Sequence, residues 1–288
     1  MELKLTHLTK LYRKHRALDD VSLTLHTGVY ALLGPNGAGK TTMMRMVADL
    51  LQPSDGTVCF DGKEVHALGE AFRRQLGYLP QNPDFYPNFT ARELLRYFAC
   101  LKKIPDPAAE IGMLLEQVHL SADADRTVGG FSGGMRRRLG IAIALLGKPS
   151  VLILDEPTAG LDPEERIRFR NIISSIGFSC IVIYATHIIS DIITIAEEII
   201  LIKDGKLLQM AKPDELLSAL NGQVWLCTVS PSEVAQLQQQ YYVTNLIKQA
   251  ENVTMRILSD HAPCDAAKTV EPNFEEVYVY WFRERGAT

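Results

Sequence analysis

The sequence predicts an α/β protein whose larger part is built around a mainly parallel sheet. Residues 151–154, 181–185 and 199–202 form short runs that are rich in β-branched residues and apolar throughout. A strand with one solvated face alternates apolar and polar residues, so these runs favour strands buried on both faces, with helices between them. The length of 288 residues suits roughly two domains.

The composition excludes several classes of protein. Hydrophobic residues make up 47% and charged residues 22% of the chain, which is close to the globular average and excludes wholesale disorder. Lys and Arg number 30 against 34 Asp and Glu, so the formal net charge is −4. Sequence-independent binding to nucleic acids depends on neutralising phosphates with basic side chains, so we expect no nucleic-acid partner.

Cysteine spacing and hydropathy bear on the location of the protein. The five cysteines are odd in number and form no Cys-x-x-Cys pair, which indicates reduced thiols in a cytosolic protein. Residues 181–202 contain ten isoleucines but also His187, Asp191, Glu197 and Glu198. Four polar groups are costly inside a bilayer, so we expect this stretch to be buried core and the chain not to span a membrane by itself.

The amino-terminal residues carry the pattern of β structure. Leu3 and Leu5 alternate with polar neighbours, and residues 21–25 repeat the alternation. Residues 57–60 lie between two Asp-Gly pairs, which are strong turn signals. We therefore expect an antiparallel β subdomain at the amino terminus. Within it, the continuous apolar run at residues 30–33 predicts a buried strand, and a helical pattern follows at about 41–51.

From about residue 85 to residue 148 the apolar period becomes helical. Thr90 and Glu93 form a capping box before a first amphipathic helix. Residues 111–118 repeat the pattern, and a third helix is predicted after Ser132. The sequence thus predicts an inserted helical subdomain.

A different unit begins near the carboxyl end. Lys212-Pro213-Asp214 opens a short helix, and Asn221-Gly222 marks a break. Beyond it, residues 224–229, 241–247 and 253–258 are predicted strands, and residues 274–282 a closing helix. We expect a first domain at residues 1–217 and a small α/β accessory domain at residues 222–288.

One motif has the spacing of a phosphate-binding loop, G-x-x-x-x-G-K-[ST], between a predicted strand and a helix. Its glycines let backbone N–H groups turn towards phosphate oxygens. Lys40 is expected to reach the β- and γ-phosphates, and the Thr41 hydroxyl to ligate Mg²⁺. A glycine-rich turn with an incidental lysine is the alternative, which the strand–loop–helix context disfavours. The residues of the loop are Gly34, Pro35, Asn36, Gly37, Ala38, Gly39, Lys40 and Thr41.

Two carboxylates, Asp155 and Glu156, follow the apolar run at residues 151–154. Alone, an Asp-Glu pair is more often a solvated turn. Beside a phosphate loop, Asp155 can bind Mg²⁺ and Glu156 can orient or deprotonate water.

A second candidate anion site begins at Ser132. Ser132, Gly133 and Gly134 combine a hydroxyl, two glycines and the predicted start of a helix, which is a favourable place for an anion. A plain helix cap is the alternative.

Taken together over residues 2–217, these motifs resemble the ATP-binding cassette (ABC) transporter ATPases in content and order. The resemblance implies a P-loop NTPase core that uses ATP and Mg²⁺. It implies catalytic roles for Glu156, His187 and Gln81, and metal ligation by Thr41, Gln81 and Asp155. The resemblance further implies that the Tyr12 ring stacks on adenine and that Thr42 belongs to the phosphate loop. The further nucleotide contacts that it implies are Ser132, Gly133, Gly134 and Asp162.

The resemblance has two departures in the signature motif, where Phe131 and Met135 replace Leu and Gln. The groups expected to contact phosphate are unchanged, so we expect altered packing and retained function. The basic run at residues 136–138 follows. We interpret it as a solvated helix face, in which only Arg138 matches a common family arginine.

In this family each ATP lies between the phosphate loop of one cassette and the signature of another. The resemblance therefore implies a second copy or a sister cassette, and a separate integral-membrane permease that docks near residues 81–90. The predicted function is an energy-coupling ATPase subunit at the cytoplasmic face of the cell membrane. The alternative is a soluble ABC-type ATPase acting on ribosomes or DNA, but the chain has neither fused cassettes nor an inserted coiled coil.

The direction of transport depends on a short segment. Residues 271–278 resemble the ending of drug- and antibiotic-export cassettes, which favours export of a drug, peptide or other small molecule. The alternative is that this segment is only a packed terminal helix.

Overall fold

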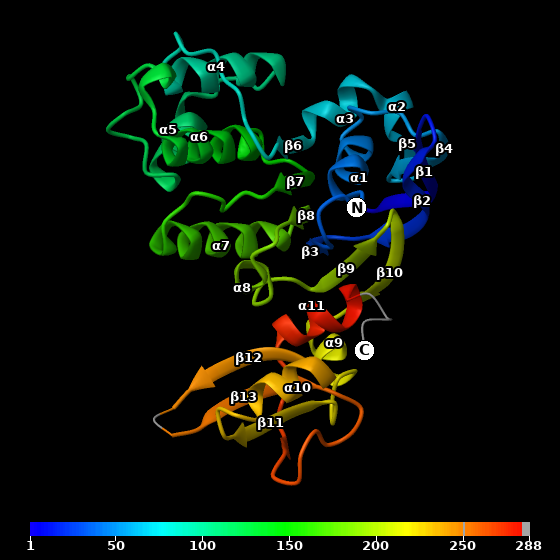
Figure 1. The fold of residues 1–288 in the computed structure, drawn as a ribbon. Coiled ribbons are helices and arrows are strands. Elements are labelled where there is room, and N and C mark those ends of the chain that lie inside the picture. The colour runs from blue at the N-terminus through cyan, green and yellow to red at the C-terminus, as the bar shows by residue number, and fades with distance from the viewer. Residues whose placement is uncertain (250, 284–288) are drawn as a thin grey trace. The chain divides into compact units, whose positions relative to one another are not determined.

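The computed structural model describes residues 1–249 and 251–283 and is built around β-sheets (Figure 1). Two of them lie in the unit Met1–Met210, and another lies in the unit that begins at Ala211. The sequence analysis ended the first domain at residue 217. The division comes earlier because helix α9 (Pro213–Ser218) packs against helix α11 (Phe274–Phe282) of the second unit.

The amino-terminal sheet is antiparallel, as the alternating sequence predicts. Its strand order is β2-β1-β4-β5, and Leu3, Leu5 and Leu25 are buried on its inner face. The strands span Leu3–Tyr12 (β1), His15–Leu25 (β2), Asp55–Phe60 (β4) and Lys63–Glu64 (β5).

The central sheet has the strand order β10-β9-β3-β8-β7-β6. Strands β3, β7, β8 and β9 contain the predicted apolar runs, and β6, β7, β8, β3 and β9 pair in parallel. The mainly parallel core is thus confirmed. The sequence analysis missed β6, because four residues are too few for a period. The bounds are Gly28–Leu33 (β3), Leu76–Leu79 (β6), Val151–Asp155 (β7), Ile181–Ala185 (β8), Glu198–Lys203 (β9) and Lys206–Ala211 (β10).

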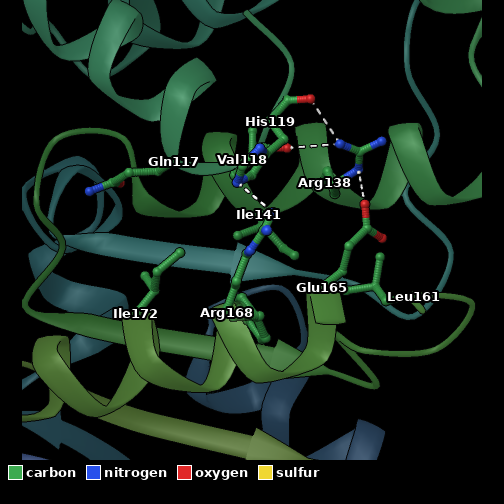
Figure 2. Close-up of a pocket in the computed structure, with 10 residues that line it drawn as sticks. Gln117, Val118, His119, Arg138, Ile141, Leu161, Glu165, Arg168 and Ile172 are labelled. Atoms are coloured by element: carbon green, nitrogen blue, oxygen red, sulfur yellow. Dashed lines mark hydrogen bonds and ion pairs between the residues drawn. The ribbon is translucent and has the colours of Figure 1, made fainter. Parts of the chain in front are cut away.

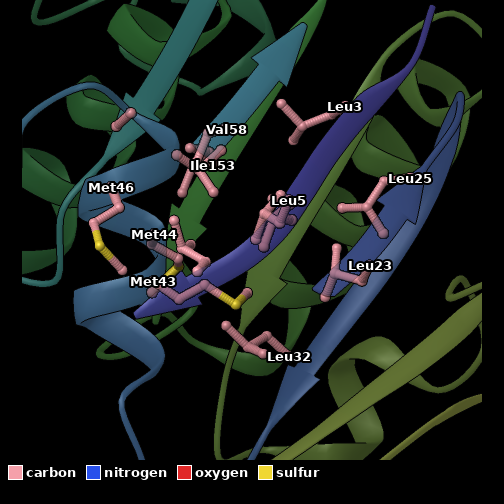
Figure 3. Close-up of a cluster of buried hydrophobic side chains, with 14 of the residues drawn as sticks. Leu3, Leu5, Leu23, Leu25, Leu32, Met43, Met44, Met46, Val58 and Ile153 are labelled. Atoms are coloured by element: carbon pink, nitrogen blue, oxygen red, sulfur yellow. The ribbon is translucent and has the colours of Figure 1, made fainter. Parts of the chain in front are cut away.

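The main hydrophobic core joins the two sheets around helix α1 (Lys40–Val47). Its methionines Met43, Met44 and Met46 are almost fully buried, and Figure 3 shows Met43 and Met44 on the side of the helix that faces the strands. Because these apolar side chains and Val47 are buried in the core, α1 is held firmly behind the phosphate loop. The helix ends at Val47, four residues before the predicted end at residue 51. It cannot continue to residue 51 because Asp49 has a left-handed backbone conformation (φ 56°).

The inserted helices form a separate layer beside β6 and β7 (Figure 1). The predicted capping box is present, because Thr90 Oγ1 accepts from the Glu93 N–H and the Thr90 N–H donates to the Glu93 carboxylate. The bounds are Ala91–Leu101 (α4), Ala108–Gln117 (α5), Val128–Gly130 (η1, a 3₁₀ turn) and Gly133–Leu145 (α6).

The remaining helices of the first unit are shorter, apart from α7. They span Val65–Leu68 (α2), Glu70–Arg74 (α3), Pro163–Gly177 (α7) and Ile189–Ile192 (α8). In the part of the chain that the structure describes, no helix has both the length and the apolar character needed to cross a membrane.

The second unit is built around a small antiparallel sheet. Its order is β12-β13-β11-β14, and α10 covers the core of Cys227, Met255 and Ile257. On α11, Glu276 is fully buried and pairs with Arg256 at 2.6 Å. The bounds are Val224–Val229 (β11), Val234–Gln240 (α10), Tyr242–Lys248 (β12), Val253–Leu258 (β13) and Lys268–Thr269 (β14).

Close packing of β6 against α6 predicts the effect of a single methyl group. A Cβ added at Gly77 lies 2.1 Å from the Ala144 carbonyl oxygen, so the strand and the helix must separate. We expect Gly77→Ala to lower the free energy of unfolding by about 1–3 kcal/mol, measured from the denaturant midpoint.

The control is Gly112→Ala, in the exposed middle of α5, where an added Cβ meets nothing within 4 Å. This change should raise stability by about 0.5–1 kcal/mol. Equal effects of the two changes would contradict the packing argument.

Candidate nucleotide-binding site

Three segments leave the central sheet at the same edge and build the site. In the parallel register, Leu32 of β3 and Asp155 of β7 both lie opposite Ala185 of β8. Each strand then continues into a loop. The phosphate loop follows β3, Glu156 follows β7 and His187 follows β8, so all three lie after the carboxyl ends of neighbouring strands. This edge is where parallel sheets bind their ligands.

The phosphate loop closes on the start of α1. Gly39 has φ 100° and caps the helix, and an added Cβ would lie 2.4 Å from the Ala17 carbonyl oxygen. Lys40 Nζ donates to the Gly34 carbonyl at 2.6 Å and to the Pro35 carbonyl at 3.0 Å. The ammonium group is therefore placed inside the loop, whose glycines allow N–H groups to face an anion.

The loop is tied to β7 by a hydrogen bond of 3.2 Å from Thr41 Oγ1 to Asp155 Oδ2. Burial raises the pKa of Asp155, an effect that the Thr41 bond partly offsets. Burial also lowers the pKa of Lys40, against the attraction of Glu156 and Asp155. A cation beside Asp155 would favour its ionised form.

A hydroxyl and one carboxylate suit Mg²⁺, which usually takes one or two carboxylates together with substrate phosphates. Within residues 1–249 and 251–283 no group of three His, Cys, Asp or Glu side chains forms an all-protein metal site. Thr41 and Asp155 thus fit a magnesium ion that nucleotide phosphates help to hold.

Glu156 takes a strained backbone at the end of β7. Its φ is 51°, and this left-handed conformation costs a non-glycine residue about 1–2 kcal/mol. The surroundings over-determine it: its N–H donates to the Ala185 carbonyl at 2.9 Å, and its carbonyl accepts from Arg137 and, at 3.2 Å, from the Ala159 N–H. Such strain is typical of functional positions.

The Glu156 carboxylate faces the loop that follows β8. Its Oε2 lies 2.9 Å from His187 Nδ1 and accepts a hydrogen bond of 3.3 Å from Thr186 Oγ1. The Glu156 side chain is 12% exposed and that of His187 is 72% exposed. A buried carboxylate with an oriented imidazole beside it can accept a proton from water and keep its position.

One cleft is lined by most of the residues that were predicted to bind the chain's own nucleotide, including Tyr12 and Gln81. It has a volume of about 520 Å³, within the usual range of small-molecule sites. His15 and Ala17 also line it, and the sequence analysis missed them because the β1–β2 turn carries no motif. Its lining residues are Tyr12, His15, Ala17, Asn36, Gly37, Ala38, Gly39, Lys40, Thr41, Thr42, Gln81, Asp155 and Glu156.

The signature and Asp162 do not line this cleft. Ser132 Oγ accepts from the Met135 N–H at 3.2 Å, and Asp162 Oδ1 accepts from the Glu165 N–H at 2.8 Å. Each residue therefore caps its own helix, α6 or α7, and both are exposed. Their roles towards a nucleotide stay predictions.

The prediction of a solvated basic run is wrong for two of its three members. Arg136 is exposed, whereas Arg137 is only 5% exposed. Arg138 lies at the small pocket between α5, α6 and α7, where its Nε pairs with Glu165 at 3.0 Å (Figure 2). Its Nη1 donates to the carbonyls of Val118 and His119 at 3.1 and 2.8 Å. Carbonyl oxygens from distant segments bind these guanidinium groups, which the local period does not reveal.

Comparison with known proteins agrees with this geometry. A family model described as "ABC transporter" matches residues 18–159. An uncharacterized ABC transporter ATP-binding protein of Bacillus subtilis, YxlF, is 36% identical over 248 residues, covering 85% of this chain and 82% of that protein. The bacitracin transport ATP-binding protein BcrA of Bacillus licheniformis is 38% identical over 217 residues, covering 74% and 71%.

Solved structures of cassettes match about three quarters of the chain. A dimeric bacterial ABC transporter cassette, MJ0796, superimposes with a TM-score of 0.67 and 26% identity, covering 73% of this chain and 98% of that one. The same cassette with ADP and Pi matches with a TM-score of 0.68. Sequence, site geometry and fold agree, and the chain belongs to the ABC transporter ATP-binding proteins.

Proposed function

We propose that this chain is the ATP-binding and hydrolysing subunit of a membrane exporter, driven by ATP-dependent closure of a cassette dimer. The observation that supports this most is the separation of the two halves of the expected site. The cleft holds Lys40, Asp155 and Glu156, whereas Ser132 and Asp162 are exposed outside it. A second copy or a sister cassette would complete the site with its own signature.

Within one chain, the residues of the cleft divide the work of hydrolysis. Lys40 neutralises charge on the β- and γ-phosphates, and Thr41 and Asp155 would hold Mg²⁺, which would supply further neutralisation. Glu156 accepts a proton from the attacking water, while His187 and Thr186 hold its carboxylate by the contacts described above. Tyr12, which is 43% exposed and lines the cleft, would stack on the base of the nucleotide.

ATP acts as a removable part of the dimer interface. When bound, it joins the phosphate loop of one cassette to Ser132, Gly133 and Gly134 of the other, because backbone N–H groups at the start of α6 favour an anion. Hydrolysis removes that link. Differential binding of ATP to the closed state is what shifts the equilibrium.

The integral-membrane permease is a separate chain in this proposal, and the protein is peripheral at the cytoplasmic face of the cell membrane. An aromatic cluster next to Gln81 supports docking there. Tyr86 is 56% and Tyr97 37% exposed, and both rings contact Phe89. Exposed aromatic rings are enriched in protein interfaces.

Export is supported by the relatives. BcrA is named for bacitracin transport, and a 34%-identical protein of Cupriavidus metallidurans is named as a Nod factor export ATP-binding protein. The ending at residues 271–278 adds less, because Glu276 and Val277 are buried and Glu276 pairs with Arg256. Packing of the second unit accounts for these residues.

Lys40→Ala tests the phosphate loop. It removes the cation inside the loop, so we expect ATP turnover to fall by at least about 10²-fold and nucleotide affinity to weaken, measured by phosphate release and by binding of a fluorescent ATP analogue. Lys63→Ala, at an exposed position of β5, is the matched control. Near-normal turnover in Lys40→Ala would refute the assignment.

Ser132→Arg tests the composite site. A bulky cation at the signature should block closure on the ATP that this signature faces, so the variant by itself should lose turnover while its own phosphate loop still binds ATP. Mixing Ser132→Arg with Lys40→Ala is the sharper test, because their mixed dimer keeps one intact site. We expect the mixture to hydrolyse more ATP than the two variants measured separately; no gain would contradict composite sites between copies of this chain.

Glu156→Gln tests the base and the switch together. Gln keeps the shape and can still bond Thr186, but it cannot accept the proton, so turnover should fall by about 10²–10⁴-fold. Loss of a negative charge near the γ-phosphate should also favour closure. Size-exclusion chromatography should show a dimer with ATP and Mg²⁺ and a monomer with ADP. A variant that binds ATP but stays monomeric would count against the switch.

A further inference from the structure

We propose that Arg137 is a positioning residue for this ATPase: it holds the backbone of Gln81 and of Glu156 to the second turn of α6. Through α6, it links the chain's own ATP site to Ser132, which serves the site of the partner cassette. The inference rests on the proposed function. Arg137 touches no substrate group in this scheme and acts only through the segments that it binds.

The contacts of Arg137 join two segments that are far apart in the sequence. Nη1 donates to the carbonyl oxygens of Pro80 and Gln81, at 3.1 and 2.5 Å. Nη2 donates to the carbonyl oxygen of Glu156. Pro80 and Gln81 follow β6, and Glu156 follows β7, so one guanidinium bridges the ends of two neighbouring strands of the parallel sheet.

Burial of this cation is costly, and packing alone does not explain it. Only 5% of Arg137 is exposed, and its Nε has no hydrogen-bond partner among the described residues. A buried charge persists where strong hydrogen bonds and nearby opposite charges offset the loss of water. Burial lowers the pKa of Arg137, and Asp155 and Glu156 act against that shift. The hydrogen bonds to the three carbonyl oxygens and the nearby carboxylates are therefore what offset the cost of burying this cation.

Glu156 depends on that contact for its geometry. Its left-handed backbone (φ 51°) persists only while its N–H and carbonyl are both held. Arg137 and the Ala159 N–H both donate hydrogen bonds to that carbonyl oxygen. Without the guanidinium, the Glu156 carboxylate can move relative to the water and the γ-phosphate, and a displacement of about 1 Å can cost 10²-fold in rate.

Helix α6 gives the contact a second consequence. Ser132 caps the helix and Arg137 lies five residues later on the same rigid element. A force on Ser132, when the partner's ATP is bound, therefore reaches Gln81 and Glu156 through Arg137. Gln81 in turn belongs to the proposed permease-docking segment. Contact with the partner's ATP, hydrolysis at Glu156 and permease docking are therefore coupled through α6 and Arg137.

The experiment compares Arg137→Gln and Arg137→Lys with Arg136→Gln, a neighbouring exposed arginine on the same helix. Each variant is also made in the Glu156→Gln background. Gln cannot bridge three carbonyls, and Lys keeps the charge without the planar fork. Thermal unfolding, ATP affinity, kcat, KM and ATP-dependent dimerisation are measured, with kcat expressed per ATP-binding-competent chain.

We expect Arg137→Gln to bind ATP with wild-type affinity, to dimerise with ATP in the Glu156→Gln background, and to lose about 10²-fold in kcat. Arg137→Lys should fall between it and wild type, and Arg136→Gln should match wild type. Wild-type kcat in Arg137→Gln would overturn the inference. So would a loss of ATP binding and dimerisation in parallel with turnover, in both Arg137 variants, because Arg137 would then only stabilise the fold.

These outcomes are distinct from failure of the proposed function. If the wild-type protein and Arg136→Gln hydrolyse no ATP, the proposed function fails. If both are active and Arg137→Gln is equally active, the inference about Arg137 fails and the proposed function stands.

Discussion

The common edge at which β3, β7 and β8 end is the constraint on which the site depends. Because the strands pair in parallel and in register, Leu32, Asp155 and Ala185 lie side by side. The loops that follow these strands therefore all start at the same edge of the sheet. The Thr41–Asp155 hydrogen bond and the bond from the Glu156 N–H to the Ala185 carbonyl then join neighbouring loops across that edge. The buried apolar face of α1 anchors the helix in the core and holds the phosphate loop against this edge.

Helix α6 connects this edge to the surface that a second cassette would meet. Its first residues carry a capping serine whose hydroxyl is already satisfied by the Met135 N–H. One turn further, Arg137 reaches back to the ends of β6 and β7. In the proposed dimer the same helix would therefore serve two sites, and the buried guanidinium would make them interdependent. Arg138 and Glu165 add a tie from α6 to α7, which begins after Asp162.

The second unit shows how a functional pattern can have a structural cause. Asn273 caps α11 and Glu276 completes the capping box while pairing with Arg256 of β13. Removing one partner of a buried ion pair leaves the other charge uncompensated, which is strongly destabilising. The acidic-aromatic ending at residues 271–278 therefore has a structural role in this unit, whichever direction transport takes.

The sequence by itself determined the buried parallel strands, the capping box at Thr90 and the phosphate-loop motif, because each depends on residues within a few positions of one another. The parallel core and the family are accordingly confirmed. Tertiary structure alone decided that Arg137 is buried while Arg136 is exposed, and that His15 lines the cleft. These outcomes depend on which carbonyl oxygens and strand ends from distant segments come together, and no local period of apolar residues carries that information.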